Sequence, residues 1–477
     1  MLSQVRLFLP ELYFLFMALV LFAVSVRHGA PQPRRTYYTA FVLSGIGLLV
    51  TLGSLFVEGE LFFQAYKVDL FSQIFKVFLS LGMFLVVTIC SRLESVEDRH
   101  HPEFYLFLTT CTIGMMLLVS AVELITLYVA LELSSYSLYI LVPMRRGGGG
   151  ELSSEAGVKY FFMGALASAV MLFGMSYLYG VCHTTHLAEI FKTLPEAVFT
   201  PGAIIGLVLT LSGLFFKLAV VPFQSWAPDV YEGASNQLVA YIASASKVAA
   251  MAILIRLTAL SGAGSAYFIN LLIILSLIGM TFGNLVAIKQ RDFKRMLAYS
   301  SIAHAGYVLL GIMTMSDAGY TSVIYYGLVY LVLNFACFLV IVLVSEKGNN
   351  VSIDQFAGLY KRAPLLAVTL LLGVFGLAGL PPTGGFTGKF LIFIAIIQKG
   401  YLWLAIVAMI NVTISLYYYI GVVKAAYLSP PAPDSVAIPV STSMRFLNYL
   451  VIAMIIWLGV YPELVYDLAS IAAKAVL

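Results

Sequence analysis

Charged side chains are scarce in this chain of 477 residues. Asp, Glu, Lys and Arg together make up 10% of it, whereas hydrophobic residues make up 61%. Soluble globular domains carry about 25% charged residues, and no soluble core of this length needs so much apolar surface. The composition therefore predicts a polytopic membrane protein that contacts the lipid bilayer. The net charge of +4 is small and spread along the chain, so we expect no nucleic-acid partner.

Cysteine is also rare, and no pair has the CxxC spacing. The four cysteines lie inside or at the ends of apolar runs: Cys90, Cys111, Cys182 and Cys337. This argues against disulfides, zinc and iron–sulfur clusters. The segment TGGFTGKF faintly resembles a phosphate-binding loop but lacks the Ser or Thr that would follow the lysine and bind magnesium. Haem ligation in a membrane bundle needs paired histidines, and within the apolar runs only His304 qualifies. No cofactor or metal is therefore expected in this chain.

Long apolar runs dominate the sequence instead. A spanning helix needs about 20 mostly apolar residues. Fourteen such runs begin near Leu7, Tyr38, Leu70, Phe104, Val122, Val158, Gly202, Gln237, Tyr267, Phe293, Tyr320, Pro364, Tyr401 and Phe446. The first lacks a small-residue cleavage site, so we expect a retained span and not a cleaved signal peptide. Because lipid cannot satisfy backbone hydrogen bonds, we predict an all-α polytopic membrane protein with about 14 transmembrane helices.

The basic residues that lie between these runs predict the orientation. The odd-numbered loops hold Arg27, Arg34, Arg35, Arg92, Arg99, Arg145, Arg146, Lys289, Arg291, Lys294, Arg295, Lys347, Lys361, Arg362 and Arg445. The even-numbered loops hold little beyond Lys67, Lys192, Arg256 and Lys399. Since cytoplasmic loops carry the excess of Lys and Arg, we expect the odd loops in the cytoplasm and both termini on the periplasmic side.

A few ionisable residues remain inside the predicted spans. They include Glu123, Glu132, Lys159, Lys217, Lys247, His304, Lys389 and Lys424. A charge at the bilayer centre costs about 2.5–3.5 kcal/mol on insertion scales, so such residues indicate an ion or proton pathway. Structural alternatives exist for those near span ends: Lys424 and Lys159 can extend their ammonium groups to the membrane surface, and Glu123 can lie at a helix end. His304 taken alone could be a core histidine.

Two of the predicted spans contain helix breakers. Span seven carries Lys217, Pro222 and Pro228, and span twelve carries the PPTGG segment and Lys389. Broken helices at membrane depth are tolerated where they line protein or a water-filled cavity, and a pair of them indicates inverted repeats. Lys217 and Lys389 are 172 residues apart, as are Glu132 and His304. We therefore predict two inverted five-helix repeats with discontinuous helices 7 and 12. The domains would be residues 1–100 (three helices), 101–262 (helices 4–8), 263–430 (helices 9–13) and 431–477 (helix 14).

Six ordered motifs resemble a known family. They are LYVALELSSYSLYILV, EAGVKYFFMGALAS, FKLAVVPFQSWAPDVYEGA, ASASKVAA, KRMLAYSSIAHAGY and GLPPTGGFTGKF. Together they resemble the antiporter-like membrane subunits of respiratory complex I, most closely the subunit N type of bacterial NADH-quinone oxidoreductase. The chain is too short for the subunit L type, and Lys389 stands where the subunit M type has a glutamate.

The resemblance implies a role for each matching position. Glu132 and Lys217 would be the ion pair of the first half-channel, and Lys159 would lie where protons enter from the cytoplasm. Lys247 would be the central relay and Lys389 the terminal one. His304 would bridge between Lys247 and Lys389.

Two departures from the family pattern affect these expectations. The family usually has histidine where Gln224 stands, and an amide carries no proton at neutral pH. The family also usually has a proline-rich segment before the eighth span, where this chain reads ASNQLVAY. We expect Ser235 or Asn236 to cap that helix.

The favoured hypothesis is therefore a proton-translocating subunit of complex I in the bacterial inner membrane. Quinone reduction elsewhere in the complex would drive it, and its partners would be the other membrane subunits of complex I. It would be part of an enzyme, with no redox chemistry in this chain. A stand-alone cation/proton antiporter, or a homologous subunit of a membrane-bound hydrogenase, is the alternative, because these share the fold. A scaffold that binds quinone or lipid without pumping is a third possibility, against which the insertion cost of the lysines argues.

Overall fold

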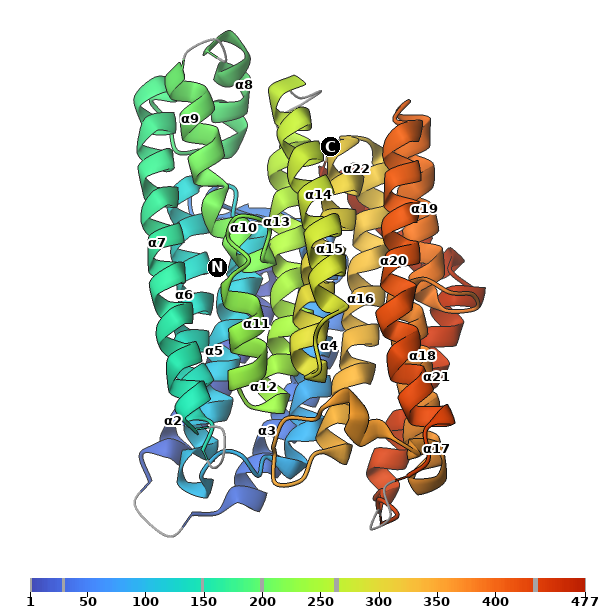
Figure 1. Cartoon of the computed structure of the whole chain (residues 1–477). Coiled ribbons are helices and arrows are strands. Elements are labelled where there is room, and N and C mark those ends of the chain that lie inside the picture. Colours follow the sequence, from blue (N-terminus) through green and yellow to red (C-terminus); the bar gives the residue numbers. More distant parts are fainter. Residues whose placement is uncertain are drawn as a thin grey trace.

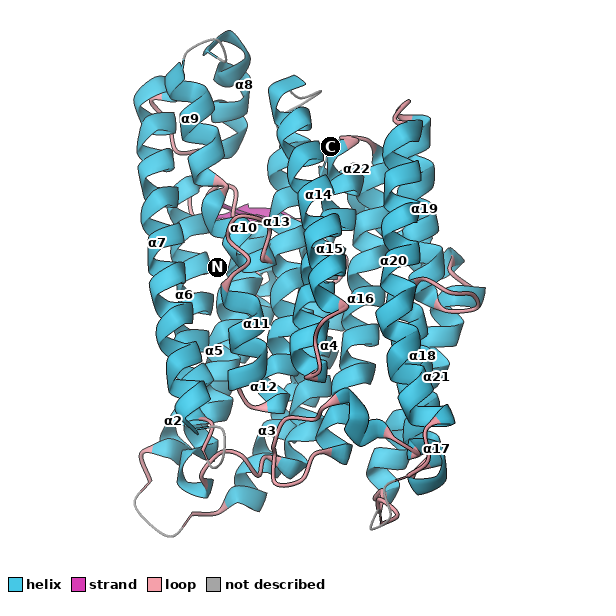
Figure 2. Ribbon diagram, viewed as in Figure 1, coloured by secondary structure: helices cyan, strands magenta, loops and turns pink. Residues whose placement is uncertain are grey.

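Helices account for almost all of the structure (Figures 1 and 2). The computed structural model describes residues 2–27, 31–146, 150–197, 201–260, 266–431 and 436–476. Within these ranges the only strands form one antiparallel hairpin, β1 (Gly59–Leu61) and β2 (Tyr66–Val68). The predicted all-α membrane fold is confirmed, and the hairpin is a small addition in a loop that the apolar pattern did not reveal.

The first half of the chain supplies the helices around the first break. These are α1 (Leu2–Leu7), α2 (Leu9–Ser25), α3 (Pro33–Gly53), α4 (Leu70–Ile89), η1 (Cys90–Arg92), η2 (Asp98–His100), α5 (His101–Ser120), α6 (Leu124–Leu141), η3 (Val142–Met144), α7 (Gly150–Cys182), α8 (Leu187–Ala197), α9 (Pro201–Thr210), α10 (Ser212–Leu218), α11 (Trp226–Gly233), α12 (Asn236–Tyr241), the π-helical turn η4 (Ile242–Ser246) and α13 (Lys247–Leu260).

The second half of the chain also consists mainly of long helices. It contains α14 (Ala266–Ala287), α15 (Phe293–Met313), α16 (Asp317–Val344), η5 (Ile353–Phe356), α17 (Leu359–Arg362), α18 (Pro364–Ala378), α19 (Gly384–Gln398), α20 (Leu402–Leu428), α21 (Thr442–Val460) and α22 (Glu463–Val476). The C-terminal region expected to be one helix is therefore two, and α22 packs against α16 and α4.

In the described part of the chain, eleven helices are long and apolar enough to cross a membrane. Four shorter apolar helices accompany them: Leu9–Ser25, Gly202–Leu218, Pro364–Ala378 and Gly384–Gln398. Three of these four, Gly202–Leu218, Pro364–Ala378 and Gly384–Gln398, adjoin the predicted breaks, where we expect two shorter helices to make up one crossing. The number of fourteen crossings remains a prediction.

Both predicted breaks are present. Helix α10 ends at Leu218 and α11 begins at Trp226, while α18 ends at Ala378 and α19 begins at Gly384. The residue after each first half has a left-handed backbone, Ala219 with φ of 59° and Gly379 with φ of 86°. Since proline cannot donate the next helical hydrogen bond, the PF and PPT segments explain both interruptions.

Lys217 and Lys389, which are 172 residues apart, do not occupy equivalent positions relative to the two breaks. Helices α14, α15 and α16 begin 165, 169 and 167 residues after α5, α6 and α7, and Gly379 follows Ala219 by 160. Lys217 consequently precedes its break, whereas Lys389 follows its own. The repeat remains a prediction, and the two lysines occupy different places relative to their breaks.

The last turn of α21 packs directly on the second break. A Cβ atom added at Gly459 would lie 2.0 Å from the carbonyl oxygen of Pro382. The hydroxyl of Thr387 donates to the carbonyl oxygen of Gly459 at 3.1 Å, and the hydroxyl of Tyr325 donates to that of Leu458. Helix α21 thereby holds the backbone from which α19 begins.

This contact predicts that Gly459→Ala destabilises the protein. The added methyl group cannot fit without moving two backbones apart, and overpacking of this kind costs about 1–3 kcal/mol. Differential scanning fluorimetry in detergent should show a lower unfolding midpoint. The control is Gly421→Ala in α20, where a Cβ atom would meet nothing within 4 Å, so the midpoint should be unchanged. Equal midpoints for the two variants would contradict the packing role of Gly459.

Candidate functional site: lysines at two helix breaks

The ammonium group of Lys217 lies between α10 and α6. It donates a hydrogen bond to the Ser134 hydroxyl at 2.6 Å, and the residue is 3% exposed. Glu132, two residues before Ser134 on α6, accepts a hydrogen bond from the Ser168 hydroxyl of α7. Among the described residues no ion pair joins Glu132 to Lys217, so serines hold the two charges that the resemblance had paired directly.

Lys247 sits where the π-helical turn η4 passes into α13. Its ammonium donates to the carbonyl oxygen of Leu218 at 3.1 Å and to the Ser301 hydroxyl at 2.7 Å. The Leu218 carbonyl is available because its helical donor would be the amide four residues later, and that residue is Pro222. The first break therefore supplies an acceptor to a lysine from the next span.

Lys389 is held by the second break in the same way. Its ammonium donates to the carbonyl oxygens of Leu377 at 2.7 Å and Ala378 at 3.2 Å. The helical donors of these two carbonyls would be Pro381 and Pro382, which have no N–H. The preceding carbonyls, of Phe375 and Gly376, are satisfied by the amides of Gly379 and Leu380. The two prolines thus free two acceptors, and the lysine takes both.

The small residue at the second break is required by this arrangement. Gly379 has a positive φ, which a side chain tolerates poorly. A Cβ atom there would also lie 2.9 Å from the Cδ atom of Lys389. Glycine at this position therefore lets the aliphatic part of Lys389 pass close to the end of α18.

His304 connects the neighbourhoods of these two lysines. Ser301, His304 and Tyr307 are spaced three residues apart on α15 and so share one face of the helix. Ser301 contacts Lys247, and the ammonium of Lys389 lies 4.8 Å from the centre of the Tyr307 ring. The His304 ring is hydrogen-bonded to the Tyr326 hydroxyl at 2.5 Å through Nδ1, and it is 2% exposed.

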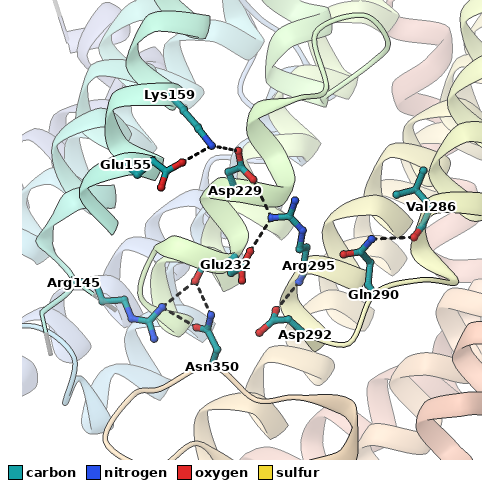
Figure 3. Close-up of polar contacts among 10 residues, drawn as sticks. All are labelled: Arg145, Glu155, Lys159, Asp229, Glu232, Val286, Gln290, Asp292, Arg295 and Asn350. Atoms are coloured by element: carbon teal, nitrogen blue, oxygen red, sulfur yellow. Dashed lines mark hydrogen bonds and ion pairs between the residues drawn. The ribbon is translucent and has the colours of Figure 1, made fainter. Parts of the chain in front are cut away.

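Lys159 lies apart from the buried row that Lys247, His304 and Lys389 form, at the end of the molecule that holds the basic residues Arg145 and Arg295. Figure 3 shows Lys159 together with these two arginines. Its side chain is 46% exposed and pairs with Glu155 at 2.7 Å and with Asp229 at 2.8 Å. Arg295 continues the network to Asp229 at 2.9 Å and to Glu232 at 2.7 Å. These residues line a half-open cleft of about 170 Å³. The structure describes no hydrogen bond between Lys159 and the buried row.

Arg145 fastens this end of the molecule and was not singled out from the sequence. Its guanidinium donates to the carbonyl oxygen of Glu232 at 2.9 Å, to the Asn350 side chain at 2.7 Å and to the Gly348 carbonyl at 3.1 Å (Figure 3). The residue is 3% exposed although it had been counted as a loop charge. Its partners are backbone carbonyls and one asparagine, which leave no recognisable signal in the sequence.

The remaining residues singled out from the sequence lie at a helix cap, on the surface or in the first break. Glu123 is the N-cap of α6 and accepts from the Thr126 amide at 2.7 Å, while Lys424 is exposed on α20. Ser235 caps α12, as expected. Gln224 lies in the first break, and its amide oxygen has no hydrogen-bond partner among the described residues.

No metal-binding group is evident in the part of the chain that the structure describes. There, no three His, Cys, Asp or Glu side chains come together in a way that could hold a metal ion. All four cysteines are buried free thiols.

Comparison with known proteins supports one family along the whole chain. A family model described as "NADH:quinone oxidoreductase/Mrp antiporter, TM" matches residues 121–415. A "NADH-quinone oxidoreductase subunit N 2" from Syntrophobacter fumaroxidans is 48% identical over 98% of this chain and 99% of its own length. The subunit N from Trichlorobacter lovleyi is 36% identical, over 99% and 98% of the two chains.

Solved structures agree with this assignment. A chain of the Thermus thermophilus respiratory complex I with bound aureothin superimposes with a TM-score of 0.83 at 30% identity, covering 97% of this chain and 99% of that one. A chain of the Mrp complex from Dietzia shares the fold, with a TM-score of 0.86 at 20% identity over 99% and 97% of the two chains. Extended identity over nearly full length therefore assigns this membrane protein to the subunit N family of NADH-quinone oxidoreductase, the respiratory complex I.

Proposed function

We propose that this chain moves protons across the bacterial inner membrane as subunit N of NADH-quinone oxidoreductase. Quinone reduction elsewhere in the complex would drive it, and the other membrane subunits of complex I would be its partners. The observation that carries the proposal is the placement of three buried ammonium groups, those of Lys217, Lys247 and Lys389, each beside a hydroxyl, a carbonyl or both. Lysine can release and regain a proton at such a site, whereas arginine stays protonated.

The proposed route has a role for each candidate residue. Lys159 and its charged cleft would collect protons at the basic end. Glu132 and Lys217 would form the first station, each using its serine partner. Lys247 would be the central station and His304 would bridge to Lys389, the terminal one. The shared face of α15 supports this order, because Ser301, His304 and Tyr307 follow one another between the two lysines.

The division of the chain follows from the same proposal. Residues 101–262 and 263–430 would be inverted repeats, each with one broken helix, flanked by residues 1–100 and by the C-terminal region. The basic loops would face the cytoplasm and both termini the periplasm. The identity to subunit N relatives favours complex I over a stand-alone antiporter or a hydrogenase subunit.

Glu132→Gln tests the first station. The change removes the charge and nearly keeps the volume, so proton pumping in vesicles that contain the reconstituted complex should fall several-fold while the complex still assembles. Glu123→Gln is the control on the same helix, because Glu123 caps α6 and is given no part in the route. Unchanged pumping by Glu132→Gln would remove this residue from the route.

Lys389→Met and Lys389→Arg test the terminal station. Methionine deletes the group that carries the proton, and arginine keeps a charge that does not dissociate. Proton uptake per electron should fall in both variants at normal assembly. Lys424→Met, at an exposed position of α20, should match the parent. Parental pumping by Lys389→Arg would make the lysine a structural cation that only satisfies two freed carbonyls.

A further inference from the structure

A buried ion pair lies among the N-terminal helices, away from the row described above. The ammonium of Lys76 on α4 is 2.8 Å from the Oε1 atom of Glu11 on α2, and their side chains are 0% and 2% exposed. The Tyr66 hydroxyl donates to the same Oε1 atom at 2.6 Å. Lys76 is the seventh residue of α4, about 9 Å from its first residue at a rise of 1.5 Å per residue. The pair therefore lies more than one helical turn inside the start of α4.

The hairpin closes this site from one end of the molecule. Tyr66, the first residue of β2, is 1% exposed and packs with Leu61 and Val68 against Leu7 and Phe8. An intramembrane ionisable pair is costly and by default indicates function. The alternative is a purely structural role, in which the ion pair only links α2 to α4.

The bonding of the pair distinguishes it from a saturated structural contact. The Oε1 atom of Glu11 takes both contacts, whereas Oε2 is buried and accepts no hydrogen bond from the described residues. An ammonium has three donors, yet the described polar contact of Lys76 is with this one carboxylate. By comparison, Lys389 and Lys247 each donate to two oxygens.

A second buried ion pair, between Arg256 and Asp69, has a hydrogen bond at both carboxylate oxygens. Arg256 of α13 donates to both carboxylate oxygens of Asp69, each at 2.9 Å, and Asp69 also caps α4. This bidentate pair cannot neutralise itself because the guanidinium stays protonated. The same region therefore contains one fixed pair and one pair that a proton transfer can discharge.

We propose that Glu11 and Lys76 form a further proton-transfer site of this subunit, on the side that carries the hairpin. In the step, an N–H bond of the Lys76 ammonium breaks and an O–H bond forms on Glu11, which leaves a neutral amine and a neutral carboxylic acid. The acid then gives its proton to a water molecule that reaches Oε2, the carboxylate oxygen without a hydrogen-bond partner among the described residues. The amine takes a proton from a hydronium ion delivered through the interior of the subunit, which restores the pair. The Tyr66 hydroxyl keeps the carboxyl group oriented throughout. This inference rests on the proposed function, because the protons must reach the site through the subunit.

The test uses the whole complex in vesicles, with proton uptake per electron and the amount of intact complex measured separately. Lys76→Arg keeps the charge and the ion pair but cannot release a proton. Lys76→Met and the double variant Glu11→Gln/Lys76→Met remove one or both charges. Lys67→Met, at a side chain 37% exposed on the same strand as Tyr66, is the control and should match the parent.

The expected result is intact complex with Lys76→Arg and a proton-to-electron ratio as low as that of Lys76→Met. The double variant should assemble and remain low. A parental ratio with Lys76→Arg would overturn the proposal, as would recovery of the ratio in the double variant. Failure of Lys76→Arg to assemble, together with assembly and normal pumping of the double variant, would show a structural pair and also overturn it. Normal pumping by the Lys389 and Glu132 variants would contradict the proposed function itself. Normal pumping by the Lys76 variants, with reduced pumping by the Lys389 and Glu132 variants, would contradict this inference alone.

Discussion

Three carbonyl groups left without helical donors are the constraint on which the interior depends. Pro222, Pro381 and Pro382 remove the amides that would bond the carbonyls of Leu218, Leu377 and Ala378. A buried acceptor without a partner costs about 1–3 kcal/mol, and lipid supplies no water to satisfy it. Lys247 and Lys389 supply the missing donors. Each break therefore makes a buried lysine tolerable, and each lysine makes a break tolerable.

The two halves of the chain use this device differently. At the first break the lysine comes from the following span, and at the second it comes from the second half of the same broken helix. Lys217, which has the matching sequence interval to Lys389, is not at a freed carbonyl but at the Ser134 hydroxyl. The predicted correspondence of the two halves therefore does not extend to individual lysines, because Lys217 precedes its break whereas Lys389 follows its own.

Three arginines hold structural positions near the ends of helices. Arg145 and Arg295 tie together the loops and helix ends at the basic end, and Arg256 binds Asp69 at the start of α4. Their planar guanidinium groups make several fixed hydrogen bonds and keep their charge. The buried groups beside α15 are instead Lys247, Lys389 and His304, whose side chains can change protonation. The permanent charges thus fix the ends of helices whose interior holds the groups able to exchange protons.

The sequence alone determined the membrane fold, the two helix breaks and the buried positions of Lys217, Lys247 and Lys389, but it did not single out Lys76, which is also buried. Apolar runs and in-span charges are local properties, and lipid leaves few structures that satisfy them. The carbonyl partners of Lys389 were also within reach, since each proline identifies the carbonyl four residues before it. Tertiary structure decided which side chains meet across helices. Glu132 is hydrogen-bonded to Ser168 and Lys217 to Ser134, and the two do not form an ion pair with each other. Arg145 is buried among loop carbonyls. It also brought Glu11 to Lys76, a contact between residues 65 positions apart. This contact depends on how α2 and α4 both pack against α3 and α5, which no local pattern encodes.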